Sequence, residues 1–191
     1  MVAHFLLKHK SENDLSTKKF NVMQNTNNGL RTFLIDSLQD IYYAEKHLVN
    51  ALETLEEKAT TQSLKNAFSE HRDTTMVHVN RLEEVFTLLG EEAQTRKCDA
   101  IKGIIKEADS IINETESDTL TRDAALILAA QKAEHYEIAT YGTLATFART
   151  LGENQVAQLL HQTLEEEKDA DEHLTEIAES FVNEQALQDT V

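Results

Sequence analysis

The sequence predicts an all-α protein, an antiparallel four-helix bundle with a short extra helix in its long central crossover. The 191 residues include no proline and only five glycines, so few residues oppose helix formation. Apolar residues recur at alternating spacings of four and three, as they do in helices that pack at small crossing angles. No segment shows the period-two alternation of polar and apolar residues that a half-buried strand requires.

Four long apolar stripes and one short stripe place the helices along the chain. The predicted helices span residues 31–59, 62–89, 98–113, 121–151 and 154–181. Gly90 and Gly152 follow the second and third long stripes, where a glycine readily ends a helix. The short amphipathic helix is expected to lie across the bundle. Four long helices with one long connection in the middle form a ferritin-like bundle.

The bundle is predicted to occupy residues 29–182, between two tails. Residues 1–28 are polar and show no apolar periodicity, which is typical of a flexible N-terminal tail. Residues 183–191 are predicted to form a C-terminal tail. The length fits one domain, and a hydrophobic content of 40% is sufficient for a real core.

Composition and charge indicate which kinds of partner and which cellular compartment to expect. A formal net charge of −16 argues against nucleic acid as a partner, because phosphate binding requires clustered Lys and Arg, and it favours cations. No apolar run approaches the ~20 residues that span a bilayer, and no signal peptide is apparent, so no membrane association is expected. The single cysteine, Cys98, is either a packing residue or a reactive thiol and fits a reducing compartment. We therefore expect a cytoplasmic protein.

Polar residues interrupt the apolar stripes near the middle of each long helix. These interruptions are Glu45, His71, His78, Glu134, Glu137 and Glu167. The midpoints of antiparallel helices of similar length lie in one layer, so these side chains are expected to meet inside the core. Burying an ionised carboxylate costs several kcal/mol, and the stripes contain no Lys or Arg that would neutralise four of them.

Two divalent metal ions would balance the four carboxylates, with imidazole nitrogen completing the coordination. Oxygen ligands with some nitrogen suit iron, which we expect, or manganese, with zinc as a substitute. Other interpretations stay open for each residue. A single glutamate can set the helix register or extend toward solvent, and a single histidine can be a hydrogen-bonded core residue.

Two further residues lie one helical turn beyond the interruptions. Tyr141 either packs in the core, hydrogen-bonds to a ligand carboxylate or donates an electron to an oxidised centre as a catalytic residue. Asp171 is either a further metal ligand or part of a solvated acidic face. The neighbouring Glu165 and Glu166 are expected to belong to that solvated face.

Four segments resemble the YciE/YciF family of ferritin-like bacterial stress proteins. They are Asp40–Lys46, Ala67–His71, Ala133–Leu144 and Thr163–Lys168. The third segment is the most specific, and the resemblance covers about Gly29 to Ser180. It implies a ferritin-like bundle, a di-metal centre, a homodimer and a link to stress responses.

The chain departs from di-iron carboxylate proteins in general, which carry Glu-x-x-His on the second and fourth helices. Ala170 stands where the histidine would follow Glu167, and Thr74 stands where the family often has a glutamate. Asp73 or a histidine of the second helix is the expected substitute. We therefore expect one of the two metal positions, the one that depends on the second helix, to bind more weakly.

These observations lead to three functional hypotheses. The first is a metal-binding stress-response protein whose di-iron centre oxidises Fe(II) with oxygen or peroxide. The second is a manganese centre that disproportionates peroxide. The third is a structural or signalling stress protein whose metal, if it binds one, only stabilises the bundle.

Overall fold

The computed structural model describes residues 6–189, with side chains described from residue 29 on. The helices are α1 (Leu6–Lys58), α2 (Gln62–Leu89), α3 (Asp99–Glu114), α4 (Leu120–Thr150), α5 (Asn154–Ile177) and α6 (Asn183–Ala186), with a π-helical segment, η1 (Ala178–Val182), before the last. The described part of the chain contains no strand, so the all-α prediction is confirmed. None of its helices combines the length and the apolar character that crossing a membrane requires. Residues 1–5 and 190–191 of the two predicted tails lie outside the described residues.

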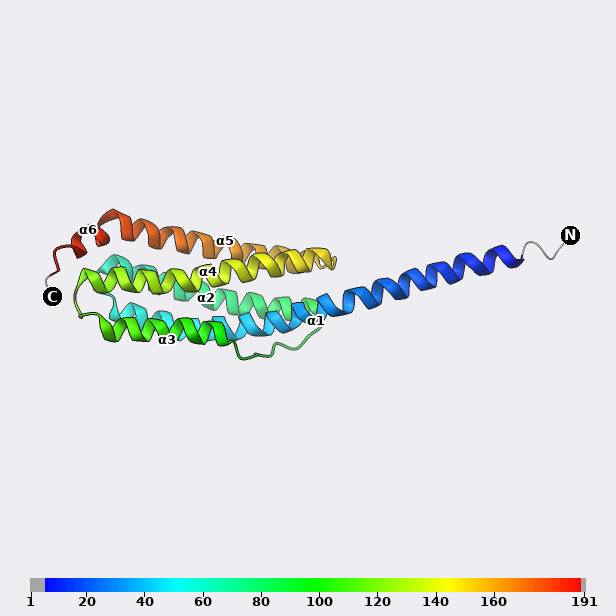
Figure 1. The fold of residues 1–191 in the computed structure, drawn as a ribbon, viewed down its shortest axis with the longest axis horizontal. Helices are drawn as coiled ribbons and strands as arrows, with labels where there is room; N and C mark the ends of the chain where they lie inside the picture. Colours follow the sequence, from blue (N-terminus) through cyan, green and yellow to red (C-terminus); the bar gives the residue numbers. More distant parts are fainter. Residues whose placement is uncertain (1–5, 190–191) are drawn as a thin grey trace.

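Two helical hairpins form the bundle (Figure 1). α1 packs with α2, α4 packs with α5, and contacts of α2 with α5 and of α1 with α4 complete the four-helix arrangement. The crossover between the hairpins contains α3. This helix runs alongside α4 and does not lie across the bundle as expected, because its apolar side, with the buried Ile101 and Ala108, packs on α4 and α1.

Both glycines that were predicted to end helices adopt left-handed backbone conformations. The φ angle is 72° at Gly90 and 84° at Gly152. After each glycine the chain donates an N–H back into the helix, from Glu91 to the Phe86 carbonyl and from Glu153 to the Ala148 carbonyl, both at 2.9 Å. These bonds satisfy carbonyl groups at the helix end, so α2 and α4 end within one residue of the predicted positions.

The first helix begins earlier than predicted. α1 starts at Leu6 and not near residue 31, and Figure 1 shows its N-terminal part extending past the other bundle helices. No proline interrupts this stretch, and the single glycine, Gly29, costs a helix only about 1 kcal/mol. A polar sequence without apolar periodicity is therefore compatible with a continuing helix. The division into tail and bundle at residue 29 stays a prediction.

The last described residues return to the bundle. α6 contacts α4, and the backbone N–H of Thr121 donates to Asp189 Oδ2 at 2.7 Å. This hydrogen bond lowers the pKa of Asp189, which is a carboxylate at the N-terminus of α4. Part of the predicted C-terminal tail thus packs beside the helix that supplies two of the candidate ligands.

Two apolar clusters fill the bundle on either side of a polar layer. One cluster follows α1 from Leu34 to Leu48, and the other begins at Leu52 and includes Phe68 of α2. The most buried members of the polar layer are Glu45, His78, Glu134, Glu137 and Glu167, each at most 2% exposed. The structure therefore brings the interrupting residues of all four long helices together in the core.

Candidate metal centre

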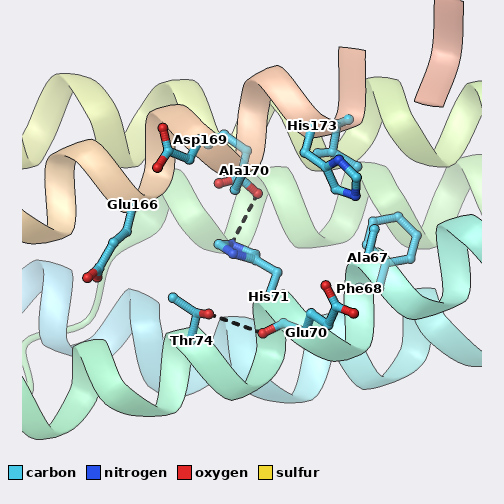
Figure 2. Close-up of a pocket in the computed structure, with 11 residues that line it drawn as sticks. Ala67, Phe68, Glu70, His71, Thr74, Glu166, Asp169, Ala170 and His173 are labelled. Carbon is cyan, nitrogen blue, oxygen red and sulfur yellow. Dashed lines mark hydrogen bonds and ion pairs between the residues drawn. The ribbon is translucent and has the colours of Figure 1, made fainter. Parts of the chain in front are cut away.

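A cavity of about 270 Å³ between α2 and α5 reaches the polar layer from the protein surface (Figure 2). Thr74, where the resembled family often has a glutamate, and Ala170, where di-iron carboxylate proteins in general have a histidine, both line this α2–α5 cavity. His71 and Glu134 line it as well. The space that larger ligand side chains would fill is therefore open beside the candidate centre.

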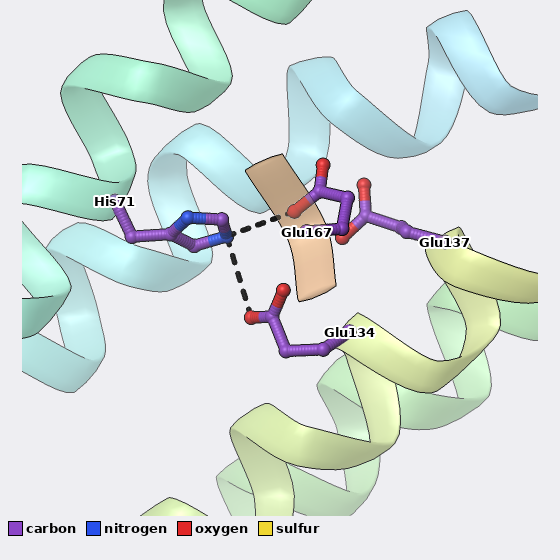
Figure 3. A group of neighbouring side chains, drawn as sticks. All are labelled: His71, Glu134, Glu137 and Glu167. Atoms are coloured by element: carbon purple, nitrogen blue, oxygen red, sulfur yellow. Dashed lines mark ion pairs between the residues drawn. The ribbon is translucent and has the colours of Figure 1, made fainter. Parts of the chain in front are cut away.

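One candidate ligand group joins α2, α4 and α5 (Figure 3). His71, Glu134, Glu137 and Glu167 each offer one nitrogen or oxygen atom, and these atoms lie within 4.8 Å of one another. His71 Nε2 is 3.3 Å from Glu134 Oε1 and 3.6 Å from Glu167 Oε2. Two ligand atoms that are each about 2.1 Å from one metal ion are at most about 4.2 Å from each other. The side chains of this first group would therefore need to shift by only a few tenths of an ångström for all four ligand atoms to reach one ion.

A second candidate group joins α1, α2 and α5. It consists of Glu45, His78 and Glu167, again with ligand atoms within 4.8 Å of one another. His78 Nδ1 is 2.9 Å from Glu167 Oε1 and 3.7 Å from Glu45 Oε1. Glu167 belongs to both groups, and its two oxygens face different histidines. This is the arrangement of a carboxylate that bridges two ions.

Helix geometry explains how the sequence forms two groups. His71 and His78 are seven residues apart, so they lie on one face of α2 about 10.5 Å apart along the helix axis. Glu134 and Glu137 lie three apart on one face of α4. Because each histidine lies opposite a different part of Glu167, α2 supplies one nitrogen ligand to each group. Both candidate groups therefore include a histidine of the second helix, and a difference in affinity between two metal positions stays a prediction.

Several buried atoms of these residues have no hydrogen-bond partner in the described part of the chain. They are Glu45 Oε2, Glu134 Oε2, Glu137 Oε1 and Glu167 Oε2, while His78 Nδ1 and Glu167 Oε1, 2.9 Å apart, have only each other. Buried polar atoms are nearly always hydrogen-bonded, and each unpaired one costs about 1–3 kcal/mol. These atoms are carboxylate oxygens and one imidazole nitrogen. They fit divalent cations that bind oxygen and imidazole ligands.

The electrostatics of the two groups favour added positive charge. Burial, and then repulsion from Glu167, raises the pKa of Glu45 to about 8. Burial also raises the pKa of Glu134 and of Glu137. Burial alone would lower the pKa of His71, but the nearby Glu134 carboxylate outweighs it and the pKa rises to about 9. The groups therefore hold protons where a cation would otherwise supply the compensating charge.

The structure separates the roles of Tyr141 and Asp171. The Tyr141 hydroxyl donates a hydrogen bond to Glu45 Oε1, so this fully buried tyrosine contacts a candidate ligand. Asp171 belongs to neither group. Its Oδ1 accepts a hydrogen bond from Gln131 Nε2 at 3.2 Å, and its Oδ2 lies 3.2 Å from His135 Nε2. Both carboxylate oxygens of Asp171 therefore contact side chains of α4.

Sequence analysis missed the contribution of Glu166. This residue was assigned to a solvated face, but its Oε2 accepts a hydrogen bond from His78 Nε2 at 2.9 Å. Arg81 holds the same carboxylate with bonds of 2.6 and 3.1 Å. Because Nε2 is bound to Glu166, Nδ1 is the nitrogen that His78 presents to Glu167. The sequence signal for this contact was Arg81, which lies one turn after His78 on α2 and needs an acidic partner on α5.

We predict that Glu166→Gln lowers metal affinity at the second group about tenfold and leaves the first group unchanged. A neutral amide forms a weaker hydrogen bond with the imidazole of His78. Removing a side chain that hydrogen-bonds to a metal-bound histidine typically lowers metal affinity 10–100-fold. Competitive titration with Zn(II) and a chelator measures both affinities. Glu165→Gln is the matched control, because Glu165 is exposed and pairs with Lys168 at 2.8 Å. Identical titrations for Glu166→Gln and the wild type would contradict a positioning role.

The sequence and fold comparisons agree on one family. The family model described as Domain of unknown function (DUF892) matches residues 29–187. Protein YciF of Escherichia coli (strain K12) is 45% identical over 153 residues, which cover 80% of this chain and 92% of that protein. The family model covers all residues of the two candidate ligand groups.

Solved structures extend the comparison to the fold. The E. coli stress protein YciF matches with a TM-score of 0.77 and 44% identity, covering 81% of this chain and 97% of that chain. YcfI, a putative structural protein from Rhodopseudomonas palustris, matches with a TM-score of 0.74 and 39% identity, covering 76% and 92%. A protein from Xanthomonas campestris pv. campestris, with a TM-score of 0.64 and 24% identity, supports the fold alone. The ferritin-like bundle and the resemblance seen in the sequence are confirmed, and the chain belongs to the DUF892 family together with YciF.

Proposed function

We propose that this chain binds two divalent metal ions, preferably iron, in the bundle core and oxidises Fe(II) with oxygen or peroxide. The observation that carries the proposal is Glu167, whose two oxygens face the histidines of two buried ligand groups in which several carboxylate oxygens have no hydrogen-bond partner among the described residues. The carboxylates of Glu45, Glu134, Glu137 and Glu167 match the four positive charges of two divalent ions. Similarity to the E. coli stress protein YciF supports a link to stress.

The residues around the two groups would prepare this reaction. Two adjacent Fe(II) ions can each give one electron, and oxygen takes up both electrons and two protons to form hydrogen peroxide. Tyr141 fixes Glu45 through its hydroxyl, and Glu166 fixes His78. Tyr141 is an oxidisable side chain in contact with a candidate ligand, so we propose that it would supply the second electron to oxygen when only one Fe(II) is present, with its hydroxyl proton passing to Glu45.

Anaerobic addition of two equivalents of Fe(II), followed by oxygen, tests this function. We expect about one oxygen consumed per two Fe(II), at least tenfold faster than in buffer alone. Protein preloaded with Zn(II) is the control, because redox-inert ions would block the same ligands. Metal analysis of untreated protein adds the identity of the resident ion. Fe(II) oxidation that is no faster with the wild type than with the Zn(II)-loaded protein would exclude the oxidase.

A structural role is the second candidate, because the similar YcfI is described as a putative structural protein. In that case metal would raise the melting temperature, while neither oxygen nor peroxide would be consumed. The manganese alternative has its own signature, since disproportionation of peroxide by Mn(II)-loaded protein releases oxygen. The same preparation therefore separates all three functions by two measurements, melting temperature and oxygen concentration.

We also propose that the chain forms a cytoplasmic homodimer. The described surface carries several exposed large apolar side chains: Phe33, Met76, Val77, Leu88, Leu128 and Leu187. Light scattering at micromolar concentration is expected to give twice the chain mass of 21.6 kDa. A compact particle with the mass of a single chain would contradict the dimer.

A further inference from the structure

The α2–α5 cavity connects solvent to the first ligand group (Figure 2). At its outer part it is lined by the exposed residues Glu70, Asp169 and His173. At its inner end it is lined by His71 and Glu134. Glu134 is 2% exposed, and its Oε2 has no hydrogen-bond partner among the described residues. The cavity thus ends at a buried carboxylate that pairs with His71 through one oxygen and has no hydrogen-bond partner for the other.

The charge of the cavity favours cations. No Lys or Arg is among its described lining residues. The carboxylates of Glu70 and Asp169 form no hydrogen bond or ion pair within residues 29–189, so nothing in that range neutralises them. Acidic walls around a cavity raise the local concentration of cations and their rate of entry.

The second ligand group is more deeply buried than the first. Glu45, His78 and Glu167 are each 0% exposed, whereas 12% of the His71 side chain is exposed. A second cavity, of about 20 Å³, touches the first group from the side of α3. Apolar side chains such as Leu52 and Ile105 dominate its lining. It has room for about one water molecule, and an apolar wall does not compensate a cation for its lost hydration.

We propose that the α2–α5 cavity is the entrance for divalent cations and that both metal positions fill through it. An entering ion meets His71 and Glu134 first. It then moves to His78 and Glu45 by exchange between the two oxygens of Glu167, which leaves the first position free for the next ion. This inference rests on the proposed metal binding and adds the route and the order of loading.

The small side chains of Thr74 and Ala170 keep the entrance open. Ala170→Leu fills the cavity with an apolar side chain and leaves every candidate ligand in place. Ala51→Leu is the matched control, because Ala51 is also a half-buried helical alanine, and it lines the small apolar cavity on the other side of the first group. The two variants therefore add the same volume next to the same ligands but on opposite sides.

Stopped-flow absorbance of Co(II) added to the full-length chain measures the loading rate, and metal analysis after dialysis gives the final stoichiometry. We expect two loading phases in the wild type. Ala170→Leu should slow both at least tenfold with two ions still bound at equilibrium, and Ala51→Leu should load like the wild type. Asp169→Asn removes one negative charge at the outer part of the cavity without filling it. This variant should load about threefold more slowly than the wild type, and the difference should disappear at high salt.

The outcomes separate the entrance from the metal site. If the wild type takes up two Co(II) ions and Ala170→Leu does so at the same rate, the entrance is wrong while the metal site stands. If only one phase is slowed, the two positions have separate routes and the order of loading is wrong. If the wild type takes up no Co(II), the metal site itself is wrong, and the entrance with it. Should Ala170→Leu fail to fold, an unchanged rate for Asp169→Asn at low salt overturns the proposal.

Discussion

Glu167→Gln is expected to abolish tight binding of both metal ions, whereas Glu45→Gln and Glu134→Gln should each weaken one position. Glu167 is the only described residue that belongs to both ligand groups. The amide keeps the shape of the side chain but removes the charge and one of the two anionic oxygens. We expect affinity to fall at least 100-fold at both positions, since even outer partners of metal ligands are worth about 10–100-fold.

All three variants should remain folded without metal. Each substitution removes one carboxylate from a buried cluster in which like charges repel, so helicity should be retained. The melting temperature of the metal-free protein should stay equal or rise for Glu45→Gln and should fall for Glu134→Gln and Glu167→Gln, because these two also remove a partner of His71 or His78. Metal analysis and circular dichroism on the same samples measure both effects, with Glu165→Gln as the surface control. One tight ion retained by Glu167→Gln would show that the two groups act independently and that Glu167 does not bridge them.

The sequence was sufficient to predict which glutamates are buried. Glu45, Glu134, Glu137 and Glu167 occupy positions in apolar stripes whose period the helix geometry fixes, so their burial follows from the pattern alone. The helix ends at Gly90 and Gly152 were predictable for a similar reason, because a local backbone conformation determines them. These features depend on residues that are close in sequence.

The grouping of the ligands could not be predicted in the same way. Which histidine faces which glutamate depends on how far α2 and α5 are displaced along the bundle axis, and a stripe pattern does not record that displacement. Glu166 was missed because its carboxylate turns back from the edge of the stripe to reach His78 and Arg81. The early start of α1 at Leu6 was missed because polar residues without periodicity are compatible with both a helix and a tail.

The metal-free protein is expected to lose stability as the pH rises from about 5 to 9. The pKa of Glu45 rises from 4.5 to about 8 on folding, so its stabilising contribution is complete below pH 4.5 and is lost as the pH rises through 8. The pKa of His71 rises from 6.5 to about 9, so its contribution is lost as the pH rises through 9. Glu166 does not oppose this trend, because its pKa falls to about 2 and its contribution is constant above pH 5.

Bound metal should remove this loss of stability, because the ion replaces the protons that the ligands hold and binds more tightly as they leave. Thermal melts at pH 5, 7 and 9 with a chelator are expected to show a fall on the order of 10 °C, whereas Zn(II)-loaded protein should show none. Glu45→Gln provides the internal control, since it removes one of the groups whose pKa is raised and should make the metal-free curve less steep. A metal-free melting temperature that rises between pH 5 and 9 would mean that the buried glutamates are already ionised and compensated by groups other than a cation.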